Sequence, residues 1–306
     1  MIVDDNVGIA KMRQSSAPVT NPHRIPTIVR ITASREPSRR MSGLTMYRMR
    51  VATCLALLAA LAGARPANAG ALEEGAERYR PYLIDGVGSA LAGARALQER
   101  AAAADLAGAK KAWLSARAGW ERSEVFTTGF VPELDAQIDA WPNAESGFHA
   151  IEAKLFGAGT TDVNADAVAL VGHLSDLNGR LKDIKLTPQG LLDGTVRLAY
   201  EVGESKADGG ESRISGTSLD DMRNNIAGIE FAYHTIFSAA LNTVDGKLDE
   251  MVTNRIERLQ AIVATPDLPH VDIADLRRTS EELVVALQGA SAKLGLQRPT
   301  LEAQAR

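Results

Sequence analysis

The chain has 306 residues, with 34 Lys and Arg, 38 Asp and Glu, and a formal net charge of −4. Residues 1–69 hold ten of the basic and only three of the acidic residues, so the remaining chain has a formal charge of −11. This acidic balance argues against binding to nucleic acid or anionic lipid and is compatible with binding cations. The single cysteine, Cys54, lies in residues 1–69, so a metal site in the remaining chain has only oxygen and nitrogen ligands.

A short apolar segment has the pattern of a secretory signal peptide. Two arginines precede an uncharged apolar run over 51–62, and an A-x-A cleavage sequence ends at Ala69. The apolar run is too short to span a bilayer comfortably. We therefore predict a signal peptide over 46–69 with cleavage near Ala69, and a periplasmic mature domain that does not insert into a membrane; the alternative is a buried helix at a domain start. Because a signal peptide begins near the start of translation, we interpret residues 1–45 as a misannotated or disordered extension.

The remaining chain is rich in Ala, Leu, Glu, Arg and Lys and shows little alternation of polar and apolar residues, which predicts helices. Asp105, the pair Thr187-Pro188, and Thr217 or Ser218 are expected at helix starts. Segments 128–145 and 207–216 are expected to be irregular. The predicted helices cover about 71–103, 106–127, 146–156, 165–184, 188–206, 218–242, 245–264 and 272–293.

These helices and their mostly short connections predict an all-α fold of two packed helical bundles. The predicted N-terminal bundle covers 70–185, the C-terminal bundle covers 186–294, and a polar tail covers 295–306. No strand or hairpin pattern competes with the helical pattern in the sequence.

The hexapeptide GFHAIE at 147–152 is the first candidate for a functional motif. His149 and Glu152 are three residues apart on a predicted helix, so both side chains project from one face and can reach one cation. Helical bundles build metal sites from Glu and His at this spacing. An exposed His–Glu pair without a ligand is the alternative explanation.

Glu121 and Glu124 form a second pair at the same spacing, beside a buried stripe that contains Trp113 and Trp120. Two carboxylates beside a buried face repel each other unless a positive charge lies between them. Arg117, one turn before Glu121, is one candidate for that charge, and a metal ion is the other.

A third set of acidic residues consists of two pairs, one before the GFHAIE hexapeptide and one after it. Its members also have ordinary explanations, as charges at the start of a helix or in a solvated loop. The set consists of Asp135, Asp139, Asp220 and Asp221.

Four segments occur in an order that resembles the imelysin family, the domain of EfeO-like and EfeM-like periplasmic iron-uptake proteins. They are WERSE at 120–124, LDAQIDAW at 134–141, GFHAIE at 147–152 and SRISGTSLDDMRNNIAG at 212–228. The resemblance covers about 72–290, and G-x-H-x-x-E is its most specific marker. It implies two helical bundles with a metal site in the cleft between them. The positions that match the family's site are Glu121, Glu124, Asp139, His149, Glu152 and Asp221.

The resemblance implies a periplasmic protein that captures iron and delivers it to an inner-membrane permease, with a peroxidase as a further partner. One imidazole and several carboxylates suit Fe(III) or Fe(II), with Mn(II), Zn(II) or Ca(II) as alternatives. These ligands bind in deprotonated form, so we expect affinity to fall below about pH 6. The resemblance implies the short EfeM-like form, for which no cupredoxin-like domain is expected. The chain has Gly-Thr-Ser-Leu-Asp at 216–220, where EfeO-like members often carry His-Thr-Asp-Leu-Trp.

Two other functions use the same features. Some family members are classed as peptidases, but a typical zinc peptidase has the pattern H-E-x-x-H. This chain has H-x-x-E followed by Ala153, so we predict a protein that is not an enzyme. The remaining alternative is a metal-dependent module that binds an envelope ligand such as an acidic polysaccharide.

Overall fold

The structure is a computed structural model that describes residues 69–141 and 145–301. All regular secondary structure in these ranges is helical, which confirms the predicted all-α fold. Within them, no helix has both the length and the apolar character needed to cross a membrane. The predicted extension at 1–45, the signal peptide at 46–69 except its last residue, and the end of the polar tail lie outside the described residues.

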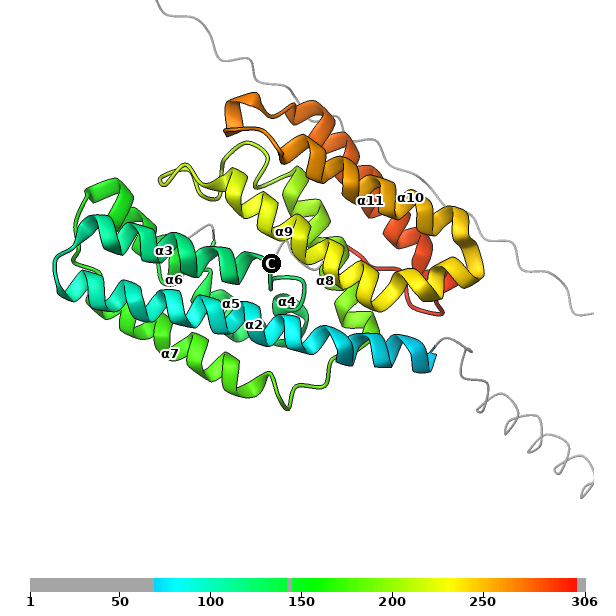
Figure 1. Cartoon of the computed structure of the whole chain (residues 1–306), viewed down its shortest axis with the longest axis horizontal. Helices are drawn as coiled ribbons and strands as arrows, with labels where there is room; N and C mark the ends of the chain where they lie inside the picture. The colour runs from blue at the N-terminus through cyan, green and yellow to red at the C-terminus, as the bar shows by residue number, and fades with distance from the viewer. Residues whose placement is uncertain (1–68, 142–144, 302–306) are drawn as a thin grey trace, which may run out of the picture. The chain divides into compact units, whose positions relative to one another are not determined.

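The helices follow one another in chain order as Figure 1 shows. They are α2 (Ala69–Ala102), α3 (Leu106–Glu121), α4 (Thr127–Phe130), α5 (Pro132–Ile138), α6 (Gly147–Glu152), the π-helix η1 (Ala153–Ala158), α7 (Asn164–Arg180), α8 (Pro188–Gly203), α9 (Ser218–Ala232), the π-helix η2 (Tyr233–Ser238), α10 (Ala239–Val263), the 3-10 helix η3 (Leu268–His270) and α11 (Ile273–Lys293).

Two of the predicted helix starts are confirmed by their capping bonds. Asp105 precedes α3 and its carboxylate accepts a hydrogen bond from the Gly108 amide at 2.9 Å. Thr187 precedes α8 and its hydroxyl accepts from the Gly190 amide at 3.2 Å. Thr217 precedes α9 but makes no side-chain capping bond, because its hydroxyl is hydrogen-bonded to Ser215 Oγ at 2.8 Å instead.

The prediction of one helix to about residue 127 is wrong, because α3 ends at Glu121. The end of α3 is stabilised by side chains that are distant in sequence. Asn225 Nδ2 donates to the Glu121 carbonyl at 2.8 Å, and Arg197 Nη2 donates to the Glu124 carbonyl at 2.8 Å. These hydrogen bonds add to the backbone bonds that the same two carbonyls accept from the amides of Glu124 and Thr127, at 3.4 and 3.2 Å.

The segment at 128–145 is not irregular throughout, as predicted, because it contains the end of α4 and all of α5. Pro132 starts α5 at a position where its missing N–H costs no helical hydrogen bond. The predicted boundary between the helices at 218–242 and 245–264 is confirmed as a kink inside α10. The chain continues from α9 through η2 into α10, and only Asp245 leaves helical geometry, with φ −157° and ψ 77°.

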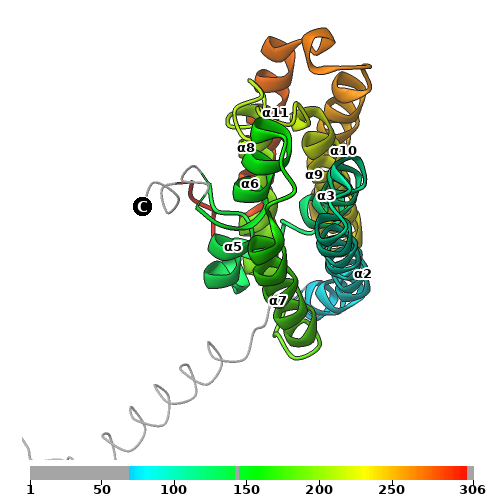
Figure 2. The ribbon, with the colours of Figure 1, turned by 90° about the vertical axis from the view of Figure 1, so that its left-hand side faces the viewer.

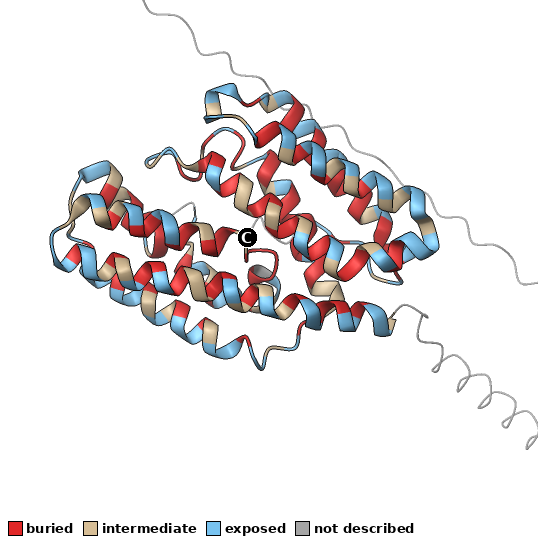
Figure 3. Ribbon diagram, in the orientation of Figure 1, coloured by how far each residue is buried: buried red, intermediate tan, exposed pale blue. Residues whose placement is uncertain are grey.

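Helices α2 and α3 pack closely, and α7 lies along α2; α8, α10 and α11 pack together on the other side (Figures 1 and 2). A Cβ atom on Gly119 would lie 2.6 Å from the Ala90 amide nitrogen, so this crossing of α2 and α3 requires glycine. The buried residues line the facing sides of the helices (Figure 3). Helix α9 packs against both α3 and α8, which brings the predicted N-terminal and C-terminal segments together at the end of α3.

Candidate metal site

The GFHAIE hexapeptide forms α6, and its glycine is required by the local backbone. Gly147 has φ +66°, and a Cβ atom there would lie 2.0 Å from the Ile138 carbonyl oxygen. This close approach places the start of α6 against the end of α5, which is followed by Asp139. The π-helix η1 follows α6 directly; such helices are frequent at functional sites.

His149 is buried between two carboxylates, one on each ring nitrogen. Its Nε2 lies 3.1 Å from Asp139 Oδ1, and its Nδ1 lies 3.2 Å from Glu152 Oε2. The other oxygen of Glu152 accepts hydrogen bonds from the backbone amide and hydroxyl of Ser215, at 2.7 and 2.6 Å. The predicted pair at 149 and 152 is therefore buried, and Glu152 contacts the ring nitrogen opposite Asp139.

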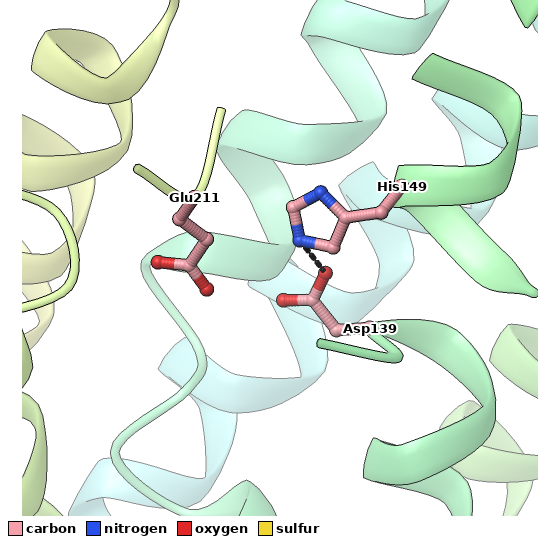
Figure 4. A group of neighbouring side chains, drawn as sticks. All are labelled: Asp139, His149 and Glu211. Carbon is pink, nitrogen blue, oxygen red and sulfur yellow. Dashed lines mark ion pairs between the residues drawn. The ribbon is translucent and has the colours of Figure 1, made fainter. Parts of the chain in front are cut away.

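The structure adds Glu211, a residue that the sequence pattern did not identify. Ligand atoms of Asp139, His149 and Glu211 all lie within 4.8 Å of one another. We call these three residues the outer group; Figure 4 shows the Asp139 and Glu211 carboxylates on the same side of the imidazole. Glu211 follows two glycines in an irregular segment, where helical periodicity gives no information about burial.

Glu121, Glu124 and Asp139 form a second set with ligand atoms within 4.8 Å of one another, which we call the inner group. Arg117 forms ion pairs with Glu121 and Asp139. It therefore supplies a positive charge beside the acidic pair, which was one of the two explanations given for that pair. The sequence pattern did not identify Lys206, whose Nζ lies 2.8 Å from Glu121 Oε2 and 3.5 Å from Glu124 Oε2.

Asp221 also lies in this cluster, but its contacts differ from those of the two groups. Its carboxylate accepts a hydrogen bond from Ser212 Oγ and lies 3.6 Å from Arg117 Nη2. The neighbouring Asp220 is exposed and pairs with Arg223 at 2.8 Å, so it lies outside the cluster. The structure thus brings together all six residues matched to the family's site.

Electrostatic interactions shift the pKa values of His149 and Asp139. Burial lowers the pKa of His149, but Asp139 and hydrogen bonds to both carboxylates outweigh burial and raise the pKa to about 9. Burial raises the pKa of Asp139, whereas Arg117 and His149 bring it well below its usual range. At neutral pH, therefore, the metal-free site contains an imidazolium beside a carboxylate.

The inner part of the cluster contains both permanent cations and groups that favour a proton. Burial lowers the pKa of Lys206, but its carboxylate neighbours raise it well above its usual value, so the ammonium stays charged. Burial and the Glu121 charge raise the pKa of Glu124 well above its usual range. The same two causes raise the pKa of Asp221 to about 7, although Arg117 opposes them.

A cavity of about 320 Å³ lies beside the outer group. His149 and Glu211 line it, whereas Glu121 and Glu124 do not, so a ligand in this cavity reaches the outer group first. The side chain of Trp141 is 44 % exposed and its ring lies 5.0 Å from the His149 ring, between centroids. The lining residues are Trp141, His149, Glu152, Gly210, Glu211, Arg213 and Ile214.

The all-helical fold contains a buried cluster of carboxylates and one histidine, the types of oxygen and nitrogen ligand from which helical bundles build metal sites. A family model described as Imelysin matches residues 75–146 and 143–294. The chain therefore belongs to the imelysin family.

Curated relatives are similar to this chain in sequence, and a solved structure is similar to it in fold. An Efem/EfeO family lipoprotein from Staphylococcus haemolyticus is 27% identical over 210 residues, which cover 64% of this chain and 71% of the relative. The iron uptake system component EfeM from Bacillus subtilis is 29% identical over 167 residues, which cover 52% of this chain and only 43% of the relative. A crystal structure from Parabacteroides distasonis, named as an iron-regulated protein A precursor, has a TM-score of 0.60 at 18% identity. It covers 76% of this chain and 97% of its own, and at this identity it shows a shared fold.

Proposed function

We propose that the protein is the metal-binding component of an iron-uptake system and that its outer group binds the ion. The observation that carries the proposal is the outer group itself: three donor atoms within 4.8 Å of one another beside a cavity of about 320 Å³. Two carboxylates and an imidazole suit iron, with manganese, zinc or calcium as alternatives. The name of the relative from Bacillus subtilis, an iron uptake system component, supports iron as the cargo.

Charge balance in the cluster supports a multivalent ion. Six carboxylates lie in the cluster, whereas Arg117 and Lys206 are its two permanently charged cations. In the metal-free protein the His149 imidazolium adds a third cation and Glu124 favours its protonated form. Loss of the His149 proton on metal binding leaves the carboxylates in excess, and a multivalent ion compensates them. The six carboxylates belong to Glu121, Glu124, Asp139, Glu152, Glu211 and Asp221.

Glu152 has a different role in this proposal from that of the outer group. With a proton on Nδ1, His149 donates to Glu152 Oε2 and keeps the lone pair of Nε2 for the ion. A carboxylate on the opposite ring nitrogen commonly orients a metal-binding histidine in this way. Ser215 in turn holds Glu152, so the G-x-H-x-x-E motif supplies one ligand and the group that positions it.

Binding and release, without catalysis, agree with these contacts. A hydrolytic metal site needs a general base beside the metal-bound water. Glu152, the carboxylate of the motif, already accepts hydrogen bonds from Ser215 and contacts His149, so it is poorly placed to act as that base. We therefore propose a protein that captures the ion in the periplasm and passes it to an inner-membrane permease, with a peroxidase as a further partner.

The test is a metal titration of the purified protein by calorimetry, with elemental analysis of the bound ion. A double variant, His149→Ala with Glu152→Ala, removes one ligand and its orienting group. The control double variant, Asp267→Ala with His270→Ala, removes an exposed carboxylate–histidine pair with the same three-residue spacing. We expect near-stoichiometric binding of iron or manganese by the protein and the control, and none by the first variant with its helical circular dichroism unchanged. Absence of iron and manganese binding by the unmodified protein would contradict the proposal and favour a non-metal envelope ligand.

A further inference from the structure

The inner and outer groups share Asp139, so one carboxylate contributes to two adjacent sets of possible ligands. Carboxylates that bridge two ions are common in helical bundles with paired metal ions, whose ions lie about 3.5–4 Å apart. The inner group by itself is only a cluster of acidic residues. What distinguishes it is that the protein already places a cation among its oxygens.

The Arg117 guanidinium pairs with Glu121 and Asp139, and a second cation is the ammonium of Lys206, which is 1% exposed. Its Nζ lies 2.8 Å from Glu121 Oε2, 3.5 Å from Glu124 Oε2 and 2.9 Å from Glu211 Oε2. The ammonium thus contacts two carboxylates of the inner group and one of the outer group. Lys206 reaches this position from the turn after α8, a part of the chain remote in sequence from Glu121 and Glu124.

Asn225 completes the surroundings of the ammonium. Its Nδ2 lies 2.8 Å from both Glu121 Oε2 and Glu124 Oε2. Its Oδ1 is buried and has no hydrogen-bond partner within the described part of the chain. A half-turn of this amide would exchange the donor for a neutral oxygen ligand at the same two carboxylates, with loss of the hydrogen bond from Nδ2 to the Glu121 carbonyl. The inner group therefore has a fourth potential donor that the present arrangement leaves unused.

We propose that Lys206 occupies the position of a second metal ion and thereby restricts the protein to one ion per chain. This inference rests on the proposed function, because the outer group must bind the first ion. An ammonium and a metal cation meet the same need for positive charge, but a metal ion would draw the oxygens about 1 Å closer, to roughly 2.0–2.2 Å. Removal of the ammonium together with its volume opens the second position.

Two substitutions separate the charge of Lys206 from its volume. Lys206→Ala removes the ammonium and leaves space for an ion, whereas Lys206→Met removes the charge but fills most of that space. With excess Mn(II), we expect one ion per unmodified chain, two per Lys206→Ala chain and one per Lys206→Met chain, by elemental analysis after gel filtration. We also expect an exchange-coupled electron paramagnetic resonance spectrum only in Lys206→Ala, because the two ions share Asp139.

The possible outcomes separate this inference from the proposed function. Two ions on the unmodified protein, or one ion on folded Lys206→Ala, would overturn the role of Lys206 alone. No ion on the unmodified protein with one on Lys206→Ala would contradict the proposed function and support the inner position. No ion on either protein would overturn both. If Lys206→Ala folds only with Mn(II) present, its count after refolding with Mn(II) and the count on the unmodified protein decide the question.

Discussion

The inner and outer groups contain the same kinds of ligand and share Asp139, but their surroundings differ. Glu121 and Glu124 of the inner group contact the Lys206 ammonium and the Asn225 amide, and neither lines the cavity. In the outer group, His149 and Glu211 line the cavity. Both groups contact internal cations, because Arg117 pairs with Asp139 and Lys206 pairs with Glu211. Only the outer group has ligands that line a cavity, so it is the group that an ion from solvent can reach.

The comparison also explains how the two halves of the chain meet. The inner group joins the end of α3 to the turn after α8 and to α9 through Lys206 and Asn225. The outer group uses the same junction, because Glu211 comes from the segment between α8 and α9 and His149 comes from α6. The internal ion pairs therefore position the outer ligands before an ion binds.

The largest effect on binding is expected from the outer ligand that the sequence pattern missed. Glu211→Gln keeps the size of the side chain and removes its charge. Loss of a residue that only hydrogen-bonds to a metal ligand costs about 10–100-fold in affinity. For loss of a ligand itself we expect the affinity for Mn(II) or iron to fall by more than about 100-fold. Calorimetry measures this loss. Glu204→Gln, an exposed glutamate on the same segment, is the matched control and should bind normally. Unchanged affinity in Glu211→Gln would remove Glu211 from the site.

A smaller effect is expected from the group that orients His149. Glu152→Gln leaves an oxygen for Ser215 but removes the negative charge beside His149 Nδ1. We expect an affinity loss of about 10–100-fold. Glu133→Gln removes an exposed carboxylate on α5 that pairs with Arg180, and it should leave the affinity unchanged. A loss in Glu152→Gln as large as in Glu211→Gln would indicate that Glu152 is itself a ligand.

Binding should release a proton at neutral pH. The pKa of His149 is raised to about 9 in the metal-free protein, and an imidazolium cannot coordinate an ion. We therefore expect the affinity for Mn(II) to rise about tenfold per pH unit between pH 6 and 8, with about one proton released per ion. The sequence predicted that the affinity falls below about pH 6. With the pKa of His149 at about 9, we expect the affinity to fall already below about pH 9. Calorimetry in buffers of different ionisation enthalpy measures the protons; a flat profile would contradict this account.

The metal-free protein should lose stability as pH rises. A histidine whose pKa is raised from 6.5 to about 9 by folding stabilises the fold below pH 6.5, and this contribution disappears as pH rises through 9. The pKa of Asp221 is raised from 3.8 to about 7, so this group also lowers the stability as pH rises between those two values. From His149 alone, we expect the free energy of unfolding to fall by on the order of 3 kcal/mol between pH 6 and 9. Urea denaturation with a chelator present tests this; a rise in stability over that interval would show that the imidazolium is not stabilised as described.

Local features were the ones that the sequence predicted well. Asp105 and Thr187 begin helices because their side chains cap the next turn, and His149 and Glu152 share a face because they are three residues apart. Each of these inferences needs only a few neighbouring residues. The choice of Arg117 as a partner for Glu121 is of the same local kind.

Features that depend on distant contacts could not be predicted. Glu211 and Lys206 lie outside regular helices, where periodicity does not reveal burial, and both reach the site only because α9 packs against α3. The early end of α3 also depends on Asn225 and Arg197, which come from α9 and α8. The acidic composition predicted a preference for cations, but the division into an inner group and an outer group beside a cavity required the tertiary structure.

The most direct test of the account is the position of the ion in a crystal of the protein soaked with Mn(II) or iron. An anomalous difference map at the absorption edge of the metal locates the ion independently of stoichiometry. The account predicts a single peak among Asp139, His149 and Glu211, about 2.0–2.2 Å from His149 Nε2, with Lys206 still beside Glu121 and Glu124. A peak between Glu121 and Glu124 in place of the Lys206 ammonium would show that the inner group is the binding site and would contradict the account.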